Sequence, residues 1–248
     1  MNIQEELKEV KDIYDSFNLM VKELGATETL QTDFISNVSH EFKTPINAIE
    51  GYASLLQEHQ QTQEEQNEYI EKILFNTRRL SSLTGNILLL SKINTQSIKP
   101  QRTSFRLDEQ VRQAILALEQ KWTEKNIDLD VELDKIQYSG YEYLLFHVWT
   151  NLIDNAIKFD PPDGMICLRM RQSGGSVIFT IEDNGPGINP EEQERIFHKF
   201  YQSDSSRKMD GNGLGLSLVK QIVELSGGAV CVENLPEAGC RFTVQLPL

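Results

Sequence analysis

The chain has 248 residues, with 39% hydrophobic and 25% charged side chains, which is typical of a globular protein with one large or two moderate domains. Its net charge of −13, without a basic cluster, argues against nucleic acid or an anionic membrane as a partner. No apolar run reaches the length of a membrane span, and no signal peptide opens the chain. The three cysteines lie on apolar, strand-like segments without metal-ligand spacing, which predicts buried thiols in a reducing compartment.

Residues 1–30 are predicted to form a charged helix with a coiled-coil seam. Apolar residues from Ile3 to Leu24 step by fours and threes, and the register continues in phase to Ile35 across a polar gap that contains Gly25. Two interpretations remain open. The segment is either a plain coiled-coil lead-in or, since the phrase FNLMVKEL resembles the end of a HAMP linker, the relay that follows the last membrane span of many receptors.

The stretch from Phe34 to Leu56 is predicted to be a helix that packs against partner helices through an apolar seam. With Ile35 at heptad position a, His40 falls at f and points away from the seam. Glu41 lies beside it, and Thr44 lies one turn further on the same exposed side. A lone surface histidine usually has no function, so this arrangement gains meaning only from the rest of the chain.

A second apolar series, from Ile73 to Leu90, predicts a second helix after a polar loop. Two helices with one apolar stripe each cannot bury those stripes alone, so two hairpins are expected to form the four-helix bundle of a homodimer. A polar linker from Thr95 to Pro100 then predicts a domain boundary. The expected division is a signalling helix at 1–30, a helical hairpin domain at 31–96 and a further domain at 97–248.

The periodicity beyond the linker predicts an α/β two-layer sandwich, with helices on one face of a mixed sheet. The expected helices are Leu107–Lys125, Tyr141–Phe159 and Leu214–Leu225. The expected strands are Asn126–Leu133, Met165–Arg171, Ser176–Asp183, Gly228–Val232 and Arg241–Leu246, with a hairpin turn at Gly174–Gly175.

The long apolar helix of this domain carries a polar stripe. Asn151, Asn155 and Lys158 fall on one face of it, just before Phe159. An amide oxygen is a hard neutral ligand suited to Mg²⁺, and a lysine one turn away can reach phosphate oxygens. The alternative is a polar stripe that merely faces solvent.

Two glycine-containing motifs follow, with an aromatic segment at residues 196–201 between them. Asp183, Gly185 and Gly187 come directly after a strand, where a carboxylate can accept from an adenine amino group, although the motif alone is also a good turn. The later run, Gly211-Asn-Gly213-Leu214-Gly215, leads into a helix whose first backbone N–H groups can bind phosphate. It matches neither a Rossmann fingerprint nor a Walker A loop.

The ordered set of motifs resembles a known family, although each motif alone is weak. It resembles the N, G1, F and G2 boxes of the Bergerat-type ATP-binding fold shared by histidine kinases, type II topoisomerases, mismatch-repair ATPases and a chaperone family. The segment SHEFKTPINAI at residues 39–49 resembles the phosphoacceptor box of sensor histidine kinases. Together these resemblances cover about residues 30–248 and identify a sensor histidine kinase of a two-component system.

The resemblance implies a role for each residue of the phosphoacceptor box. His40 would be phosphorylated on a ring nitrogen, and Glu41 would orient the imidazole or accept its proton. Thr44 would position a water that dephosphorylates the partner, the receiver domain of a response regulator. The hairpin would form a homodimer, and the chain would be the cytoplasmic portion of a bacterial membrane receptor, attached to the membrane only through a missing N-terminal part.

The resemblance also implies ATP and Mg²⁺ as cofactors. Asn155 would be the main Mg²⁺ ligand with Asn151 in support, Lys158 a phosphate contact and Asp183 the adenine contact. The other residues expected to shape the nucleotide pocket are Phe159, Gly185, Gly187, Gly211, Gly213, Leu214 and Gly215. Residues 189–210 would form a lid over the nucleotide.

Two rival functions remain open from the sequence. A conformational ATPase related to the topoisomerases would need a catalytic glutamate four residues before Asn155, where this chain has Asn151. A coiled-coil module with a vestigial nucleotide site would not bind ATP. Incorporation of a labelled γ-phosphate distinguishes both rivals from a kinase.

Overall fold

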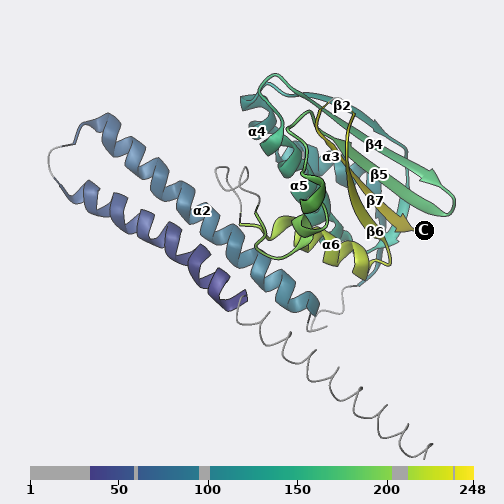
Figure 1. The fold of residues 1–248 in the computed structure, drawn as a ribbon, viewed down its shortest axis with the longest axis horizontal. Helices are drawn as coiled ribbons and strands as arrows, with labels where there is room; N and C mark the ends of the chain where they lie inside the picture. Colours follow the sequence, from purple (N-terminus) through teal and green to yellow (C-terminus); the bar gives the residue numbers. More distant parts are fainter. Residues whose placement is uncertain (1–33, 59–60, 95–100, 203–211, 237) are drawn as a thin grey trace, which may run out of the picture. The chain divides into compact units, whose positions relative to one another are not determined.

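The computed structural model describes residues 34–58, 61–94, 101–202, 212–236 and 238–248 (Figure 1). The predicted coiled coil at 1–30 and the glycine Gly211 lie outside the described residues. The chain divides into two compact units, Met1–Leu80 and Ser81–Leu248, which are described separately. Among the described residues, no helix is both long and apolar enough to cross a membrane.

The first unit contains most of a helical hairpin, as the two apolar seams predict, and the second helix continues past Leu80. Its first helix covers residues 34–57 and runs through the buried Pro45 without interruption, and the second, α2, covers Gln63–Asn94. A capping box begins α2: the Thr62 N–H donates to Glu65 Oε2 (2.8 Å), and the Glu65 N–H donates to Thr62 Oγ1 (3.2 Å). This reciprocal pair explains why the polar loop ends where it does.

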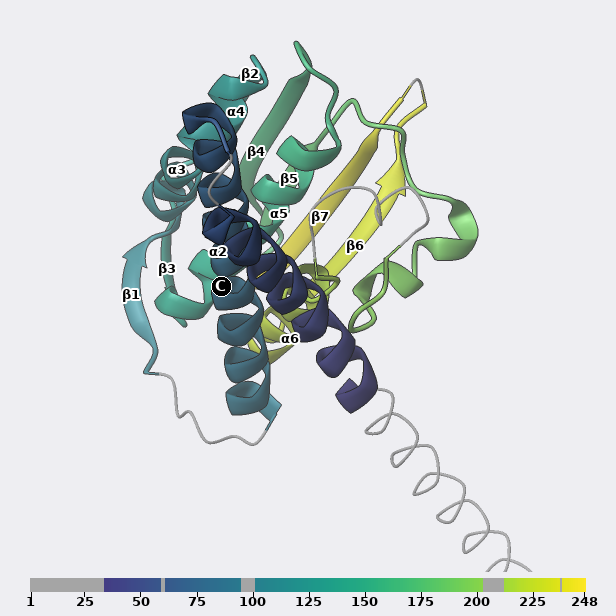
Figure 2. The ribbon, with the colours of Figure 1, turned by 90° about the vertical axis from the view of Figure 1, so that its left-hand side faces the viewer.

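The second unit is built on a five-stranded mixed sheet with the order β2-β4-β5-β7-β6 (Figure 2). The pair β2–β4 is parallel and the other neighbours are antiparallel. The strands are β2 (Asp128–Leu133), β4 (Met165–Ser173), β5 (Ser176–Glu182), β6 (Ala229–Asn234) and β7 (Cys240–Pro247). Gly174 and Gly175, both at positive φ, make the predicted two-residue turn between β4 and β5.

Helices cover one face of this sheet (Figure 1). They are α3 (Leu107–Ala117), α4 (Glu119–Glu124), α5 (Glu142–Phe159) and α6 (Gly215–Leu225). The expected single helix Leu107–Lys125 is wrong, because the chain leaves helical geometry at Leu118 (φ −110°, ψ 12°) and restarts as α4. The indole of Trp122 then folds back and donates to the Ile115 carbonyl (3.2 Å).

The alternation of buried and solvent-facing residues along the strands confirms the two-layer sandwich. Phe179 of β5 is fully buried, and the centroid of its ring lies 4.9 Å from that of Trp149 on α5. The opposite face is polar: there Arg241 bonds to Glu182 and Glu233 (2.8 and 2.9 Å). Of the three free cysteines only Cys240 is buried, Cys167 is half-buried and Cys231 is exposed, so the expectation of three buried thiols is wrong.

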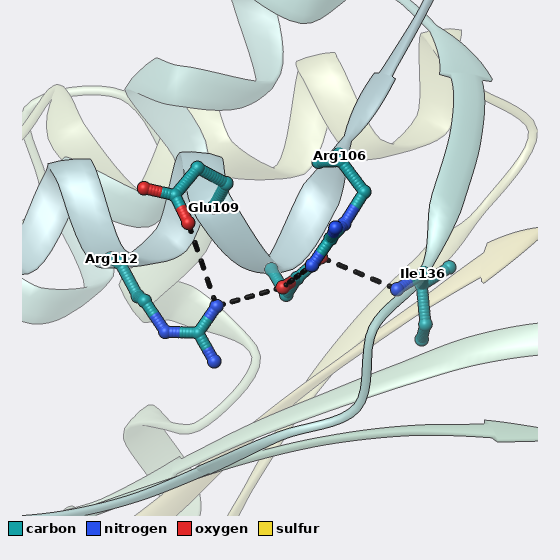
Figure 3. Close-up of polar contacts among 5 residues, drawn as sticks. Arg106, Glu109, Arg112 and Ile136 are labelled. Atoms are coloured by element: carbon teal, nitrogen blue, oxygen red, sulfur yellow. Dashed lines mark hydrogen bonds and ion pairs between the residues drawn. The ribbon is translucent and has the colours of Figure 1, made fainter.

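A second, two-stranded sheet was not expected from the sequence. It pairs β1 (Thr103–Arg106) with β3 (Gln137–Gly140) in antiparallel register. The fully buried carboxylate of Asp108, at the start of α3, connects the two strands of this sheet. It accepts hydrogen bonds from Arg106 Nε (2.8 Å) on β1 and from the Ile136 N–H (3.3 Å) just before β3 (Figure 3). Arg112 Nη1 donates a further hydrogen bond to Asp108 Oδ2 (2.7 Å). These donors, Arg106 first, hold the pKa of Asp108 well below its ordinary value.

Candidate functional site

The first helix presents His40 on its exposed side. Thr44 lies one turn later on the same side, and its hydroxyl donates to the His40 carbonyl oxygen (3.3 Å). This bond within the helix holds the Thr44 hydroxyl against the His40 backbone. The predicted neighbours therefore share one solvent-accessible surface.

The third residue of this group, Glu41, contacts the other helix of the hairpin. Its Oε2 lies 3.1 Å from Nη2 of Arg79 on α2, and both side chains are partly buried. Sequence reasoning missed Arg79, because the relative register of two helices cannot be read from their separate seams. The pair holds the Glu41 carboxylate against α2, one residue along the chain from His40.

The polar stripe of α5 lies against the start of α6. The Asn151 amide group donates to the His147 carbonyl (2.7 Å), which turns its oxygen Oδ1 away from its own helix. A Cβ atom on Gly215 would lie only 2.6 Å from that oxygen, so the close approach depends on glycine. The structure thus brings the asparagine motif and the last glycine motif together. Asn155 and Lys158 follow on the same face of α5, half-buried.

The described part of the last glycine motif makes a tight turn into α6. Gly213 has a positive φ of 65°, and its carbonyl accepts from the Phe200 N–H (2.8 Å). Leu214 is fully buried, and its N–H donates to Asn212 Oδ1 (3.1 Å). The aromatic segment and the glycine turn are therefore in direct contact, ahead of a helix N-terminus that can receive an anion.

Asp183 is buried (3% exposed) at the end of β5. Its Oδ1 accepts from the Gly185 N–H (3.0 Å), and its Oδ2 accepts from the thiol of Cys240 (3.1 Å). Burial raises the pKa of Asp183, and these hydrogen bonds oppose that shift in part. Cys240 was not expected at this site, because it lies on the last strand, 57 residues further along the chain.

The two glycines after Asp183 allow the loop that follows β5 to lie close to neighbouring segments. A Cβ atom on Gly185 would lie 2.8 Å from the Phe159 carbonyl oxygen at the end of α5. Gly187 has a positive φ of 73°, and the next residue, Ile188, is clasped by the Asn234 side chain through both its N–H (2.8 Å) and its carbonyl (2.7 Å). The loop is thus held between α5 and the end of β6.

The region expected to form a lid is described up to residue 202. It contains two short 3-10 helices, η1 (Pro190–Glu192) and η2 (Arg195–Phe197). The Tyr201 hydroxyl donates to Glu192 Oε1 (2.6 Å). The Phe197 ring packs edge-on against Phe242 of β7, with the two ring centroids 6.4 Å apart. His198 is exposed. These contacts anchor the beginning of the segment on the sheet.

The donor set fits Mg²⁺ bound together with a phosphate ligand. Within the described ranges, no group of three or more His, Cys, Asp or Glu side chains could hold a metal by itself. Mg²⁺ commonly takes one or two protein oxygens and completes its shell with phosphates and water. The amide oxygens of Asn155 and Asn151, on the face that meets the glycine turn, suit that arrangement.

Comparison with known proteins identifies the class of this site and then the family. Residues 140–248 match the family model "Histidine kinase-, DNA gyrase B-, and HSP90-like ATPase", so the second unit carries a domain of that class. Residues 30–96 match the model "His Kinase A (phospho-acceptor) domain". With both domains in this order, the chain belongs to the sensor histidine kinases of two-component systems.

Individual relatives agree with this assignment. The chain is 35% identical over 231 residues to heme sensor protein HssS of Staphylococcus saprophyticus, covering 93% of this chain and 49% of that protein. It is 32% identical over 225 residues to sensor-like histidine kinase SenX3 of Mycobacterium bovis, covering 89% of this chain and 54% of that protein. The chain thus spans about half the length of these curated relatives.

A solved structure shares both the hairpin and the sheet domain. The histidine kinase ThkA, in complex with response regulator protein TrrA, superimposes with a TM-score of 0.70 at 27% identity, covering 88% of this chain and 62% of that chain.

Proposed function

We propose that this chain is a protein-histidine kinase that transfers the γ-phosphoryl group of ATP to His40 and then to an aspartate of a response regulator. One observation carries the proposal: motifs dispersed in the sequence approach one another closely in pairs. Asn151 meets Gly215, Phe159 meets Gly185, and Phe200 meets Gly213. An ordinary set of surface turns would have no reason to converge in this way.

The match to the ATPase domain family and this geometry both support ATP as the ligand. Asp183 is the adenine contact, and the first N–H groups of α6 face the phosphates at the positive end of the helix dipole. Lys158 adds a positive charge for the phosphate oxygens. Mg²⁺, held by Asn155 with support from Asn151, would neutralise charge on the transferred group.

In the transfer step, a ring nitrogen of His40 attacks the γ-phosphorus and the bond to the bridging oxygen of ADP breaks. The attacking nitrogen must carry a lone pair, so the imidazole proton must reside on the other nitrogen or leave. Glu41, the adjacent carboxylate, is the group proposed to hold or accept that proton. The exposed position of His40 allows an ATP-bearing domain to dock on it.

A response regulator is the proposed acceptor of the phosphoryl group. The complex of ThkA with TrrA supports such a partner for a kinase of this architecture. Thr44, one turn from His40, is proposed to position a water for dephosphorylating the regulator. Thr44→Ala should leave autophosphorylation intact and weaken regulator dephosphorylation. An undiminished dephosphorylation rate would remove Thr44 from that role.

The hairpin is proposed to dimerise, and the chain to be the cytoplasmic portion of a longer membrane receptor. Apolar side chains of the hairpin in the first unit stay exposed in a single chain: Ile35, Ile46, Leu55, Ile70, Leu74 and Phe75. Pairing with a second hairpin would cover such a surface. The sensor relatives, about twice as long as the matched region, support the receptor assignment.

The test of the proposed function is incubation with Mg²⁺ and ATP labelled on the γ-phosphate. A kinase incorporates label into the chain, and Asp183→Ala or chelation of the metal abolishes the incorporation. Release of labelled phosphate without labelled protein would favour a conformational ATPase. Absence of nucleotide binding would favour a coiled-coil module with a vestigial site.

A further inference from the structure

Asp160 is a buried acid of the second unit that the proposed mechanism does not use. Asp160 ends α5 with extended backbone geometry (φ −63°, ψ 141°), and only 2% of the residue is exposed. Its Oδ1 accepts from the Asn184 N–H (2.7 Å). Its Oδ2 has no hydrogen-bond partner within the part of the chain that the structure describes. A buried acid with one unpaired oxygen calls for a physical reason.

The bond from Asp160 to Asn184 joins the two halves of the proposed nucleotide site. On one side is the end of α5, which carries Lys158 two residues and Asn155 five residues before Asp160. On the other side is the loop that begins at Asp183, immediately before Asn184. The next N–H of that loop, from Gly185, is already taken by Asp183 itself. Asp160 therefore provides a side-chain link between the phosphate side and the adenine side.

The charged and titratable groups around Asp160 come from three elements. Asp183 lies on the loop after β5, Cys167 on β4, and Lys125 directly after α4. The Lys125 ammonium donates to three backbone carbonyls at the end of α5, those of Ile157 (2.8 Å), Lys158 (2.9 Å) and Asp160 (2.7 Å). Since these bonds use all three of its protons, it caps the helix and does not hydrogen-bond the Asp160 carboxyl group.

The surroundings of the second oxygen favour an uncharged acid. A Cβ atom on Gly164 would lie 2.1 Å from Asp160 Oδ2, so the backbone of the turn after α5 covers this oxygen. An ionised carboxylate with an unpaired, covered oxygen costs more than a neutral acid in the same place. Burial, first, and the nearby Asp183 charge raise the pKa of Asp160 against the opposing effects of Asn184 and Lys125.

We propose that Asp160 is a positioning residue of the nucleotide site, which holds the Asp183 loop against α5 as a neutral carboxylic acid. Nucleotide affinity then falls as pH rises and Asp160 ionises, because a second buried carboxylate charge repels that of Asp183 across the link. The inference rests on the proposed nucleotide-binding function and deepens it. The acid touches no reacting atom and acts through Asn184 on the neighbouring Asp183.

The experiment compares binding of ADP with Mg²⁺ by the intact chain and its variants from about pH 5 to about pH 9. Asp160→Asn keeps the acceptor for Asn184 but cannot ionise, whereas Asp160→Ala removes the link. Asp163→Asn is the matched control, since Asp163 lies on the same turn but is exposed. Dividing each wild-type affinity by that of Asp160→Asn removes the titration of the nucleotide and of all other groups.

The expected result has three parts. Asp160→Asn binds within about twofold of wild type at the acidic end, and the ratio of wild-type to variant affinity falls as pH rises. Asp160→Ala binds about tenfold more weakly at the acidic end, the loss expected for one hydrogen bond to a buried group. Asp163→Asn follows the wild-type profile.

Two outcomes would overturn the inference. They are a pH-independent ratio of wild type to Asp160→Asn, and wild-type affinity in Asp160→Ala. If Asp160→Ala does not fold, the pH dependence of the ratio between wild type and the near-isosteric Asp160→Asn still tests the inference. If the wild type binds no nucleotide at any pH, the proposed function itself fails, a result distinct from failure of the Asp160 inference alone.

Discussion

Glu41 and Arg79 join the two helices of the hairpin through a hydrogen-bonded ion pair of 3.1 Å, one residue from the proposed phosphoacceptor. Arg79 takes the oxygen Oε2, so the other carboxylate oxygen is the one that could receive a proton from His40. The pair would thereby keep the Glu41 carboxylate in one place beside the residue that it is proposed to assist. Arg79→Ala should lower the autophosphorylation rate by about tenfold without changing nucleotide affinity, since a misaligned proton acceptor loses much of its contribution.

The control for this prediction is Arg78→Ala, which removes a neighbouring exposed arginine from the same helix. Arg79→Lys keeps the charge and should recover part of the rate. The measurement is the initial rate of label incorporation at saturating ATP. A faster reaction in Arg79→Ala would show the opposite relationship, in which Arg79 withholds Glu41 from the histidine.

Asn155→Ala should raise the Mg²⁺ concentration needed for half-maximal autophosphorylation by at least about tenfold, because the proposed metal would lose its main protein oxygen. Asn155→Asp keeps an oxygen at the same place and should be less impaired. Titration of autophosphorylation with Mg²⁺ at fixed ATP provides the measurement. An unchanged Mg²⁺ requirement in Asn155→Ala would assign the metal to other groups.

Asp108→Ala should lower the free energy of unfolding of the second unit by about 3 kcal/mol, because two guanidinium groups and the Ile136 N–H lose their acceptor. The folded-state pKa of Asp108 is depressed, so its stabilisation is present above the ordinary aspartate pKa and is lost as pH falls through the folded value. The difference between wild type and variant should therefore shrink below about pH 4.

Denaturant titrations at several pH values measure this effect. Glu109→Ala is the matched control, because Glu109 is exposed and lies 3.7 Å from Arg112. An exposed pair of this kind contributes only about 0.5 kcal/mol. Equal destabilisation by the two variants would mean that the buried Asp108 carboxylate contributes no more to the free energy of unfolding than an exposed one.

The thiols should differ in reactivity at neutral pH. Cys231 is exposed, whereas Cys240 is 5% exposed, and burial together with Asp183 raises the pKa of its thiol. An alkylating reagent should therefore modify Cys231 first and leave Cys240 intact until the protein unfolds. Mass spectrometry of the modified peptides provides the readout. Early modification of Cys240 in the folded protein would contradict the buried thiol–carboxylate contact.

Periodicity predicted most of the second unit because its elements are long or strongly patterned. The apolar helix α5 and the β4–β5 hairpin at Gly174–Gly175 lie close to their expected bounds. The strands β1 and β3 have four residues each, too few for alternation to be recognised. The break between α3 and α4 at Leu118 was missed because apolar residues continue through it without a glycine or proline.

Motif spacing predicted which candidate site residues share one element, as Asn151, Asn155 and Lys158 share a face of α5, but not their contacts with distant segments. Arg79, Asn184 and Cys240 contact Glu41, Asp160 and Asp183 across 38, 24 and 57 residues. Such contacts depend on how helices and strands are packed, which no local pattern encodes. Asp160 was missed for the same reason: in the sequence it is only a polar residue before Pro161.

The chemical stability and location of the label show whether His40 accepts the γ-phosphoryl group of ATP. After incubation with γ-labelled ATP and Mg²⁺, we expect label that is lost in acid, survives alkali, maps to the peptide containing His40 and is absent from His40→Ala. His198→Ala, which alters another exposed histidine, should label normally. Acid-stable label, or label that persists in His40→Ala, would show that His40 is not the acceptor.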